Sequence, residues 1–501
     1  MSAGGTPGAG GTLSDEGTVT AYETVVGLEV HCELATTTKL FCGCRNAFGQ
    51  EPNTNVCPVC LGLPGSLPVV NRRAVELALR IGTALNCRAQ RSIFHRKNYF
   101  YPDMPKDYQI SQYDEPINID GWLELPDGSR VGIERAHMEE DTGKTTHVGG
   151  GGRIHEAGHS LVDYNRAGVP LVEIVSRPDI RSASQARAYV TELRSILVAT
   201  GASDGRMEEG SLRVDANVSI RPAGSLEYGT RCEVKNLNSL RSLQRAIDYE
   251  VARQTALLET GERVAQETRH WNEAGGTTHA LRSKEEANDY RYFPEPDLVP
   301  LVPDAELLAA AAAGVGSMPA ERRRLLEQLV SGDSKAPIPA RGDSSTDQVV
   351  TVVDLGLDEL VAGAVAAGAD PRLALARTAN EAAASPEAAR SLDRLAFAAL
   401  LKMESSGQLS ATQSKEVLAE LIARGGDPAQ IAARLGYEQM DAVALEAIVD
   451  DVIAANPEEW ERFRDGDEKV AQFLLGQVMR ATKGKANGKT VAALFAARRD
   501  A

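Results

Sequence analysis

Hydrophobic and polar residues alternate strictly over several short stretches in the first half of the chain. In residues 26–34 (VGLEVHCEL) every second position is apolar, and Glu29 and His31 lie between the apolar positions. Residues 212–220 (LRVDANVSI) repeat the pattern, with Asp215 among the polar positions. A period of two places alternate side chains on opposite faces of a strand. The pattern predicts half-buried strands in an antiparallel α+β sheet whose second face carries ionisable groups.

The second half of the chain changes to a helical period. Apolar residues recur three and four positions apart in residues 445–453, which predicts an amphipathic helix. Ser410 and Gln413 fit a capping box, and the helix that they open should stop at Gly425. All eight histidines and all seven cysteines lie before residue 280. We therefore expect all-α C-terminal modules that follow a domain carrying most of the reactive side chains.

Four parts are expected along the chain. The first twenty residues have neither a basic start nor an apolar block, so they are predicted to be a disordered tail and not a signal peptide. Prolines cluster near residues 296–303, where helices and central strands should end. The expected parts are a tail at 1–20, a sheet domain at 21–298, a helical linker domain at 299–400 and a helical tail domain at 401–501.

Charge and composition exclude several classes of protein. The 501 residues carry 54 Lys and Arg against 70 Asp and Glu, a net charge of −16. This balance argues against nucleic-acid binding through bulk positive charge, so an RNA contact needs a local basic patch or a partner chain. No apolar run approaches the roughly 18–20 residues of a membrane span. Seven cysteines are too few for a disulfide scaffold, which predicts a reducing, cytoplasmic location.

Four of the cysteines form two close pairs. One residue separates Cys42 from Cys44, and twelve residues separate Cys44 from Cys57, which forms a C-x₂-C pair with Cys60. Zinc binds four thiolates at the corners of a tetrahedron, and C-x₂-C turns supply two of them. The alternative is four reduced cysteines without a metal. A bound zinc would be structural, because four thiolates leave no coordination position for a substrate.

Carboxylates gather on the polar faces of the predicted strands. Glu29 and His31 lie two positions apart, which separates side chains on one strand face by about 6–7 Å. Glu139 and Glu140 end another predicted strand, and Asp215 lies on a third. Mg²⁺ prefers one or two carboxylates together with phosphate oxygens. These residues are candidate ligands of a magnesium site, and for each of them alone a solvated strand-face charge is the alternative.

Several long and chemically unusual stretches distinguish this sequence. They are VGLEVHCEL (26–34), CPVCLGLPGSLPVVN (57–71), HRKNYFYPDMPKDYQISQ (95–112), HMEEDTGKTTH (137–147), DYNRAGVPLVEIVSRPD (163–179), MEEGSLRVDANVSIRP (207–222), EVKNLNS (233–239), DYRYFPEPDL (289–298) and QFLLGQVMRATKGKAN (472–487). On these stretches the chain resembles the B subunits of the aspartyl/glutamyl-tRNA amidotransferases. The resemblance covers most of residues 22–298 and is weaker over 299–400.

The resemblance implies a fold and a reaction. The sheet domain would be a catalytic cradle similar to the catalytic fold of glutamine synthetase. It would use ATP and Mg²⁺ to phosphorylate the side-chain carboxylate of mischarged Glu-tRNA(Gln) or Asp-tRNA(Asn), and ammonia would then displace the phosphate. The glutaminase, or A, subunit would supply the ammonia, and a small C subunit would hold the pair together. Phosphoryl transfer needs mainly positioning and charge neutralisation, which fits the ionisable face predicted above.

The resemblance also implies roles for particular side chains. The candidate metal and nucleotide-phosphate ligands are Glu29, His31, Glu139 and Glu140. The side chains expected to complete this site are Arg213, Asp215, Asn217 and Lys235. Lys97 and Lys106 are expected to contact phosphates or the substrate carboxylate, and a surface salt bridge is the alternative for each of them.

The end of the chain carries a local basic cluster, which consists of Arg480, Lys483, Lys485, Lys489, Arg498 and Arg499. Such a cluster can contact RNA phosphates, which gives affinity without sequence choice. The tail domain is therefore expected to bind tRNA, and a basic helix end that satisfies its own dipole is the alternative. For the whole chain, the alternative function is a non-catalytic tRNA-binding scaffold with the same cradle.

Overall fold

The computed structural model describes residues 22–149, 157–281, 290–332, 344–437, 442–482, 486 and 488–499. The tail predicted at residues 1–20 lies outside these residues, as do Lys483 and Lys485. The chain divides into two compact units, Met1–Ala320 and Glu321–Ala501. The finer boundaries at residues 298 and 400 stay predictions. Within the described ranges, no helix is both long enough and apolar enough to cross a membrane.

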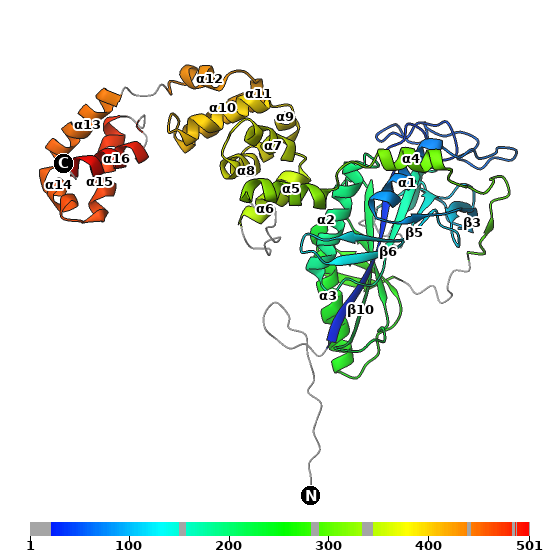
Figure 1. Cartoon of the computed structure of the whole chain (residues 1–501). Helices are drawn as coiled ribbons and strands as arrows, with labels where there is room; N and C mark the ends of the chain where they lie inside the picture. Colours follow the sequence, from blue (N-terminus) through cyan, green and yellow to red (C-terminus); the bar gives the residue numbers. More distant parts are fainter. Residues whose placement is uncertain are drawn as a thin grey trace, which may run out of the picture. The chain divides into compact units, whose positions relative to one another are not determined.

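A mostly antiparallel sheet of twelve strands forms the centre of the first unit (Figure 1). Its strands are β1 (Tyr22–Glu33), β2 (Arg88–Ala89), β3 (Phe94–Asn98), β4 (Tyr108–Gln112), β5 (Asn118–Glu124), β6 (Arg130–Glu140), β9 (Pro170–Ser176), β10 (Leu212–Pro222), β11 (Cys232–Leu237), β12 (Thr268–Asn272), β13 (Thr277–Ala280) and β14 (Phe293–Pro294). Their order is β13-β12-β11-β10-β1-β9-β6-β4-β3-β14, with β5 paired to β2 and β6. β11 and β12 run parallel. A separate hairpin consists of β7 (Lys144–Val148) and β8 (His159–Asp163).

The alternation predicted for β1 is confirmed. Val26, Leu28, Val30 and Cys32 are at most 1% exposed, whereas the residues between them are partly accessible. β1 lies between β9 and β10, near the middle of the sheet. Its polar residues therefore lie near the centre of the other face of the sheet, the one that points away from the core.

Helices cover the apolar face of the sheet. They are α1 (Arg72–Ala84), α2 (Ala183–Ala199), α3 (Leu240–Glu259) and the shorter α4 (Ala305–Ala313), and Figure 1 shows the first three beside the strands. Side chains from all four helices share one hydrophobic core with the apolar residues of β1. Asn71, Ser182 and Ser239 cap α1, α2 and α3 by accepting hydrogen bonds from backbone N–H groups of the first turn.

The described elements of the second unit are helical. They are α5 (Pro319–Ser331), α6 (Ser344–Asp354), α7 (Asp358–Ala366), α8 (Pro371–Asn380), η2 (Ala382–Ala384), α9 (Pro386–Arg390), α10 (Arg394–Ser405), α11 (Ala411–Arg424), α12 (Pro428–Arg434), α13 (Ala442–Ala455), α14 (Pro457–Arg464), α15 (Glu468–Ala481) and α16 (Gly488–Arg499). One hydrophobic core lies within residues 326–432 and another within residues 445–495. The predicted capping box of Ser410 and Gln413 is confirmed at the start of α11, which ends at Gly425 with φ +67°. The α+β class with a C-terminal helical region is thus confirmed, whereas the likeness to glutamine synthetase stays a prediction.

Candidate functional site

Strand pairing brings the polar residues of distant segments together on the open face of the sheet. In the β1–β10 ladder, Glu29 lies opposite Asp215 and His31 lies opposite Arg213. In the β1–β9 ladder, His31 lies opposite Glu173. Because paired residues in neighbouring strands point to the same face, these side chains form one ionisable surface.

A histidine and two glutamates form the centre of this surface, and we call them the histidine–glutamate cluster. His31 Nε2 lies 3.3 Å from a Glu139 oxygen and 3.6 Å from a Glu173 oxygen. His137 Nε2 lies 3.4 Å from the same Glu173 oxygen. One ligand atom from each of His31, Glu139 and Glu173 lies within 4.8 Å of the others. Carboxylate and imidazole donors at this spacing can converge on one divalent cation.

The electrostatics of the cluster favour a positive charge. Burial lowers the pKa of His31, but hydrogen bonds and charge from Glu139 and Glu173 outweigh that effect and raise the pKa to about 10. Burial raises the pKa of Glu173, but His137 and His31 bring it well below its usual value. Glu173 thus remains ionised between the imidazoles of His31 and His137, and a metal cation could replace the imidazolium charge of His31.

Further polar side chains extend the surface along β10 and β11. Asn217 donates a hydrogen bond to Glu29 at 3.0 Å. Lys235 Nζ lies 2.8 Å from Asp215 and 2.6 Å from Glu233. Burial and the negative charge of Glu173 raise the pKa of Glu29. These contacts place four predicted site residues, Glu29, Asp215, Asn217 and Lys235, beside the cluster.

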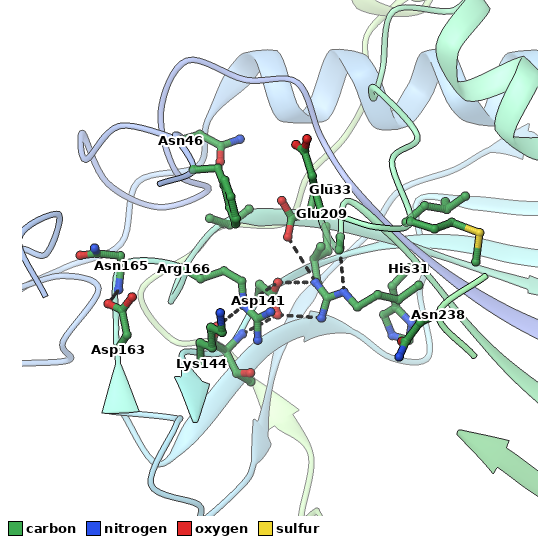
Figure 2. Close-up of a pocket in the computed structure, with 18 of the residues that line it drawn as sticks. His31, Glu33, Asn46, Asp141, Lys144, Asp163, Asn165, Arg166, Glu209 and Asn238 are labelled. Atoms are coloured by element: carbon green, nitrogen blue, oxygen red, sulfur yellow. Dashed lines mark hydrogen bonds and ion pairs between the residues drawn. The ribbon is translucent and has the colours of Figure 1, made fainter. Parts of the chain in front are cut away.

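On the other side of the cluster, two arginines enclose a buried aspartate. Arg213 pairs with Asp141, and Arg166 Nε lies 3.2 Å from the same carboxylate; these ion pairs can be followed around Asp141 in Figure 2. Arg213 also lies 3.5 Å from Glu33. Burial and the adjacent Asp141 raise the pKa of Glu33 to about 7 despite the two arginines. Arg166 donates hydrogen bonds to the carbonyls of Thr142 and Gly143, so the network also fixes the loop after β6.

Lys97 on β3 faces the cluster from the opposite edge of the surface. Its ammonium lies 4.9 Å from the centre of the Tyr290 ring. Burial lowers the pKa of Lys97, but Glu139 and the rings of Tyr292 and Tyr290 more than offset this effect and raise the pKa. The side chain therefore carries a positive charge beside the cluster, and its predicted contact with phosphates or the substrate carboxylate stays a prediction.

Glu140 and Lys106 lie elsewhere. Glu140 follows Glu139 on β6 and points to the opposite face of the strand, where it pairs with Lys106. Both side chains are buried, and Glu140 also accepts a hydrogen bond from the backbone N–H of Ile110 at 2.9 Å. The structure therefore does not bring Glu140 into the predicted magnesium site, nor Lys106 to its phosphates.

Two cavities meet at the cluster. The larger has a volume of about 1170 Å³ and includes the Asp141 network, and Figure 2 shows residues that line it. The smaller has a volume of about 860 Å³ and includes Glu173 and Lys235. Both are lined by His31, Lys97, Glu139 and Asp215. Two ligands bound in these cavities would therefore meet beside the histidine–glutamate cluster.

The four predicted zinc cysteines also come together. Their sulfur atoms all lie within 4.8 Å of one another, and those of Cys57 and Cys60 are 3.8 Å apart. A tetrahedron with zinc–sulfur bonds of about 2.3 Å has sulfur–sulfur edges of about 3.8 Å, so the donor set fits zinc. Lys39 is fully buried beside them, with its ammonium 3.8 Å from the Cys60 sulfur and 3.0 Å from the Asn55 carbonyl. This cation partly offsets the negative charge of four thiolates.

The sequence predictions did not include Glu173 or His137. The sequence of β9 (PLVEIVS) is mostly apolar, as expected of a strand that is buried on both faces, and Glu173 interrupts this apolar run. A single carboxylate within such a run indicates a buried partner or a functional site, because burying an unpaired charge is costly. The alternation along β6 places His137 on the same strand face as Glu139, although the predicted ligand set does not include it.

Comparisons with known proteins give a consistent result. Residues 24–309 match the family described as "GatB/GatE catalytic domain", and residues 359–498 match the "GatB domain". A protein of Mycobacterium sp. (strain KMS) is 49% identical over 503 residues, covering 97% of this chain and 98% of the relative. A protein of Salinispora tropica is 50% identical over 501 residues, covering 95% and 96%. Both relatives are named as the B subunit of an aspartyl/glutamyl-tRNA(Asn/Gln) amidotransferase.

Proposed function

The chain belongs to the family of aspartyl/glutamyl-tRNA(Asn/Gln) amidotransferase B subunits, and we propose that it catalyses the ATP-dependent activation step of that reaction. In this step the side-chain carboxylate of Glu-tRNA(Gln), Asp-tRNA(Asn) or both receives the γ-phosphate of ATP. Ammonia from a glutaminase partner then displaces phosphate and leaves the amide. The observation that carries the proposal is the histidine–glutamate cluster at the junction of two cavities.

The residues of the cluster suit a magnesium ion. His31, Glu139 and Glu173 would hold it, and Glu29 lies two positions from His31 on the same strand face. A bound Mg²⁺ would neutralise phosphate charge during transfer. The two carboxylates would hold the cation, and the ion-pair network around Asp141 fixes the neighbouring loop. Glu140 has no place in this proposed ligand set because it lies on the other face of β6.

Two cationic side chains complete the proposed reaction centre. Lys97 lies on the boundary of both cavities, where it can face the phosphate that leaves one ligand and joins the other. Arg213 lines the larger cavity and is held in place by Asp141 and Glu33. Positive charges fixed in this way stabilise developing negative charge without reorganising during the reaction. We assign the smaller cavity to the nucleotide and the larger one to the esterified amino acid.

An acyl phosphate is hydrolysed when water reaches it, so ammonia should arrive by an enclosed route. The sequence shows no glutaminase motif, and we therefore propose a stable complex with the glutaminase (A) and small (C) subunits of such an enzyme. The cysteine cluster would hold a structural zinc in this complex. The C-terminal helices would contact the tRNA, with Arg498 and Arg499 near the end of α16.

The activation step can be tested without the glutaminase reaction. The assembled complex is given Mg·ATP, ammonium chloride and either Glu-tRNA(Gln) or Asp-tRNA(Asn), and ADP and amidated tRNA are measured. Glu139→Gln should abolish ADP formation with both substrates. Glu124→Gln, at a half-buried carboxylate of β5 that pairs with Arg130, should leave ADP formation unchanged. Full activity of the Glu139→Gln complex would contradict the proposal. Amidation without ATP consumption would also contradict it.

A further inference from the structure

One wall of the larger cavity is a loop that no hydrophobic core supports. The loop consists of residues 45–56, which lie between the two cysteine pairs, and we call it the cysteine loop. Asn46, Phe48 and Gln50 are among the loop residues that line the cavity. Residues 47–54 are all exposed. Apolar burial therefore cannot fix the shape of this wall, and polar contacts have to do so.

The segment at the end of β8 holds the cysteine loop through its side chains. Asn165 accepts a hydrogen bond from the backbone N–H of Asn55 at 2.8 Å and donates one to the carbonyl of Glu51 at 2.7 Å. The carboxylate of Asp163 accepts hydrogen bonds from the backbone N–H groups of Asn53 and Asn165, at 3.0 and 2.9 Å. The side chain of Asn165 thus binds the backbone of two loop residues that lie four positions apart.

Asn53 binds the same segment from the side of the loop. Its side chain donates a hydrogen bond to the Val162 carbonyl at 3.0 Å and accepts one from the backbone N–H of Tyr164 at 2.8 Å. Its φ is +59°, in the left-handed region that asparagine adopts more easily than most residues. The cysteine loop and the segment are therefore bound to each other by side chains of both.

The residue after Asn165 connects this segment to the Asp141 network. Arg166 contacts the Asp141 carboxylate and donates hydrogen bonds to two carbonyls of the loop after β6. Figure 2 shows Asn165 beside Asp163, with Arg166 reaching from there towards Asp141. Consecutive side chains of one segment thus hold the cysteine loop on one side of the cavity and the loop after β6 on the other.

We propose that Asn165 is a positioning residue for the aminoacyl end of the tRNA, because it holds the cysteine loop in the shape that lines the larger cavity. This inference rests on the proposed function, which assigns that cavity to the esterified amino acid. Without the Asn165 side chain, only a fraction of the molecules would have the loop in place, and the apparent affinity falls by that fraction. Once the substrate is bound the loop is in place, so the rate of the chemical step should not change.

Asn165→Ala removes both side-chain bonds to the cysteine loop. The assembled full-length complex is given saturating Mg·ATP and ammonium chloride, and the concentration of Glu-tRNA(Gln) is varied. The KM for Glu-tRNA(Gln) should rise at least about fivefold, equivalent to about 1 kcal/mol, while kcat stays within about twofold of wild type. Gln90→Ala is the matched control, because it removes an amide hydrogen bond to the Pro116 carbonyl at a residue that does not line this cavity. An unchanged KM, or a loss in kcat alone, would overturn the inference.

Two further measurements do not depend on catalysis. Binding to the complex is compared for Glu-tRNA(Gln) and for the same tRNA without its 3′-terminal nucleotides and amino acid. Asn165→Ala should weaken the first at least about fivefold and leave the second unchanged, because the shortened RNA does not reach the cavity. Deuterium uptake by a peptide covering residues 45–56 should be faster in the variant, with uptake by β1 unchanged. Equal loss of affinity for both RNAs, or unchanged uptake by the cysteine loop, would contradict the proposed role.

If Asn165→Ala fails to fold, Asn53→Gly takes its place. This variant removes the two side-chain bonds of Asn53, and glycine adopts a positive φ without strain. It should show the same rise in KM and the same faster uptake, and wild-type values for both would overturn the inference. A wild-type complex that forms no ADP would instead overturn the proposed function, and the comparison of the two RNAs would still decide the role of Asn165.

Discussion

Glu139 and Glu140 are neighbours in sequence, but the structure gives them different tasks, and substituting each with glutamine should separate these tasks. Glu139 contacts His31 on the open face of the sheet, whereas Glu140 pairs with Lys106 on the other face. Glu139→Gln should therefore lower the affinity for a divalent cation. Glu140→Gln should lower the stability of the first unit and leave cation affinity unchanged.

The expected stability loss follows from burial. The Glu140 and Lys106 side chains are only 3% and 6% exposed. Removing one partner of a buried ion pair leaves an uncompensated charge, which costs about 3–5 kcal/mol. In the double variant Lys106→Met, Glu140→Gln no charge remains, so it should be more stable than Glu140→Gln alone. Mutating a residue that only orients a metal ligand typically lowers metal affinity about 10–100-fold. Because Glu139 is itself a proposed ligand, Glu139→Gln should lower cation affinity by at least this much.

Tryptophan fluorescence can follow the first unit alone. The chain has three tryptophans, of which Trp122 on β5 and Trp271 on β12 lie in the sheet. Trp460 packs against Phe463 and Phe495 in the second unit, and Trp460→Phe removes its signal. Urea unfolding in this background reports the free energy of unfolding, and Mn²⁺ titration reports cation affinity. Equal stability of Glu140→Gln and wild type, or a loss of Mn²⁺ affinity in Glu140→Gln, would refute the reasoning.

Three further predictions concern the zinc site and the tail. Metal analysis should find about one zinc per chain, lost when Cys57 and Cys60 become serine; retained zinc would rule out this site. Lys39→Met should release zinc to a chelator faster than Lys39→Arg, because it removes the buried cation; equal release rates would show that this charge is not needed. Removing residues 442–501, which contain a core of their own, should weaken tRNA binding far more than glutaminase activity, and equal losses would argue against tRNA binding there.

Local sequence patterns predicted the strands and helices well, because burial alternates along a strand and caps are formed within a few residues. The alternation of β1 and the capping box at Ser410 are such features, and both are present. The same alternation places Glu139 and Glu140 on opposite faces of one strand. The prediction that both residues bind one magnesium ion therefore conflicts with the alternation of side chains along this strand.

Strand order could not be derived from local patterns, because the partners lie far apart in sequence. β1 pairs with β9 and β10, about 140 and 180 residues later, and this pairing alone brings Glu173 to His31. The burial of Lys39 beside Cys60 is equally non-local. A lysine carries no sequence signal for full burial, since it is normally exposed.

The central claim is that a magnesium ion and ATP bind together at the histidine–glutamate cluster. Pulsed electron paramagnetic resonance on the assembled complex, loaded with Mn²⁺ in place of Mg²⁺ and with ATP, tests this claim directly. We predict coupling of the Mn²⁺ spin to an imidazole nitrogen and to ATP phosphorus in the same sample, with the nitrogen coupling lost in His31→Gln. Phosphorus coupling without any nitrogen coupling in the wild type would place the nucleotide-bound metal elsewhere and contradict the account.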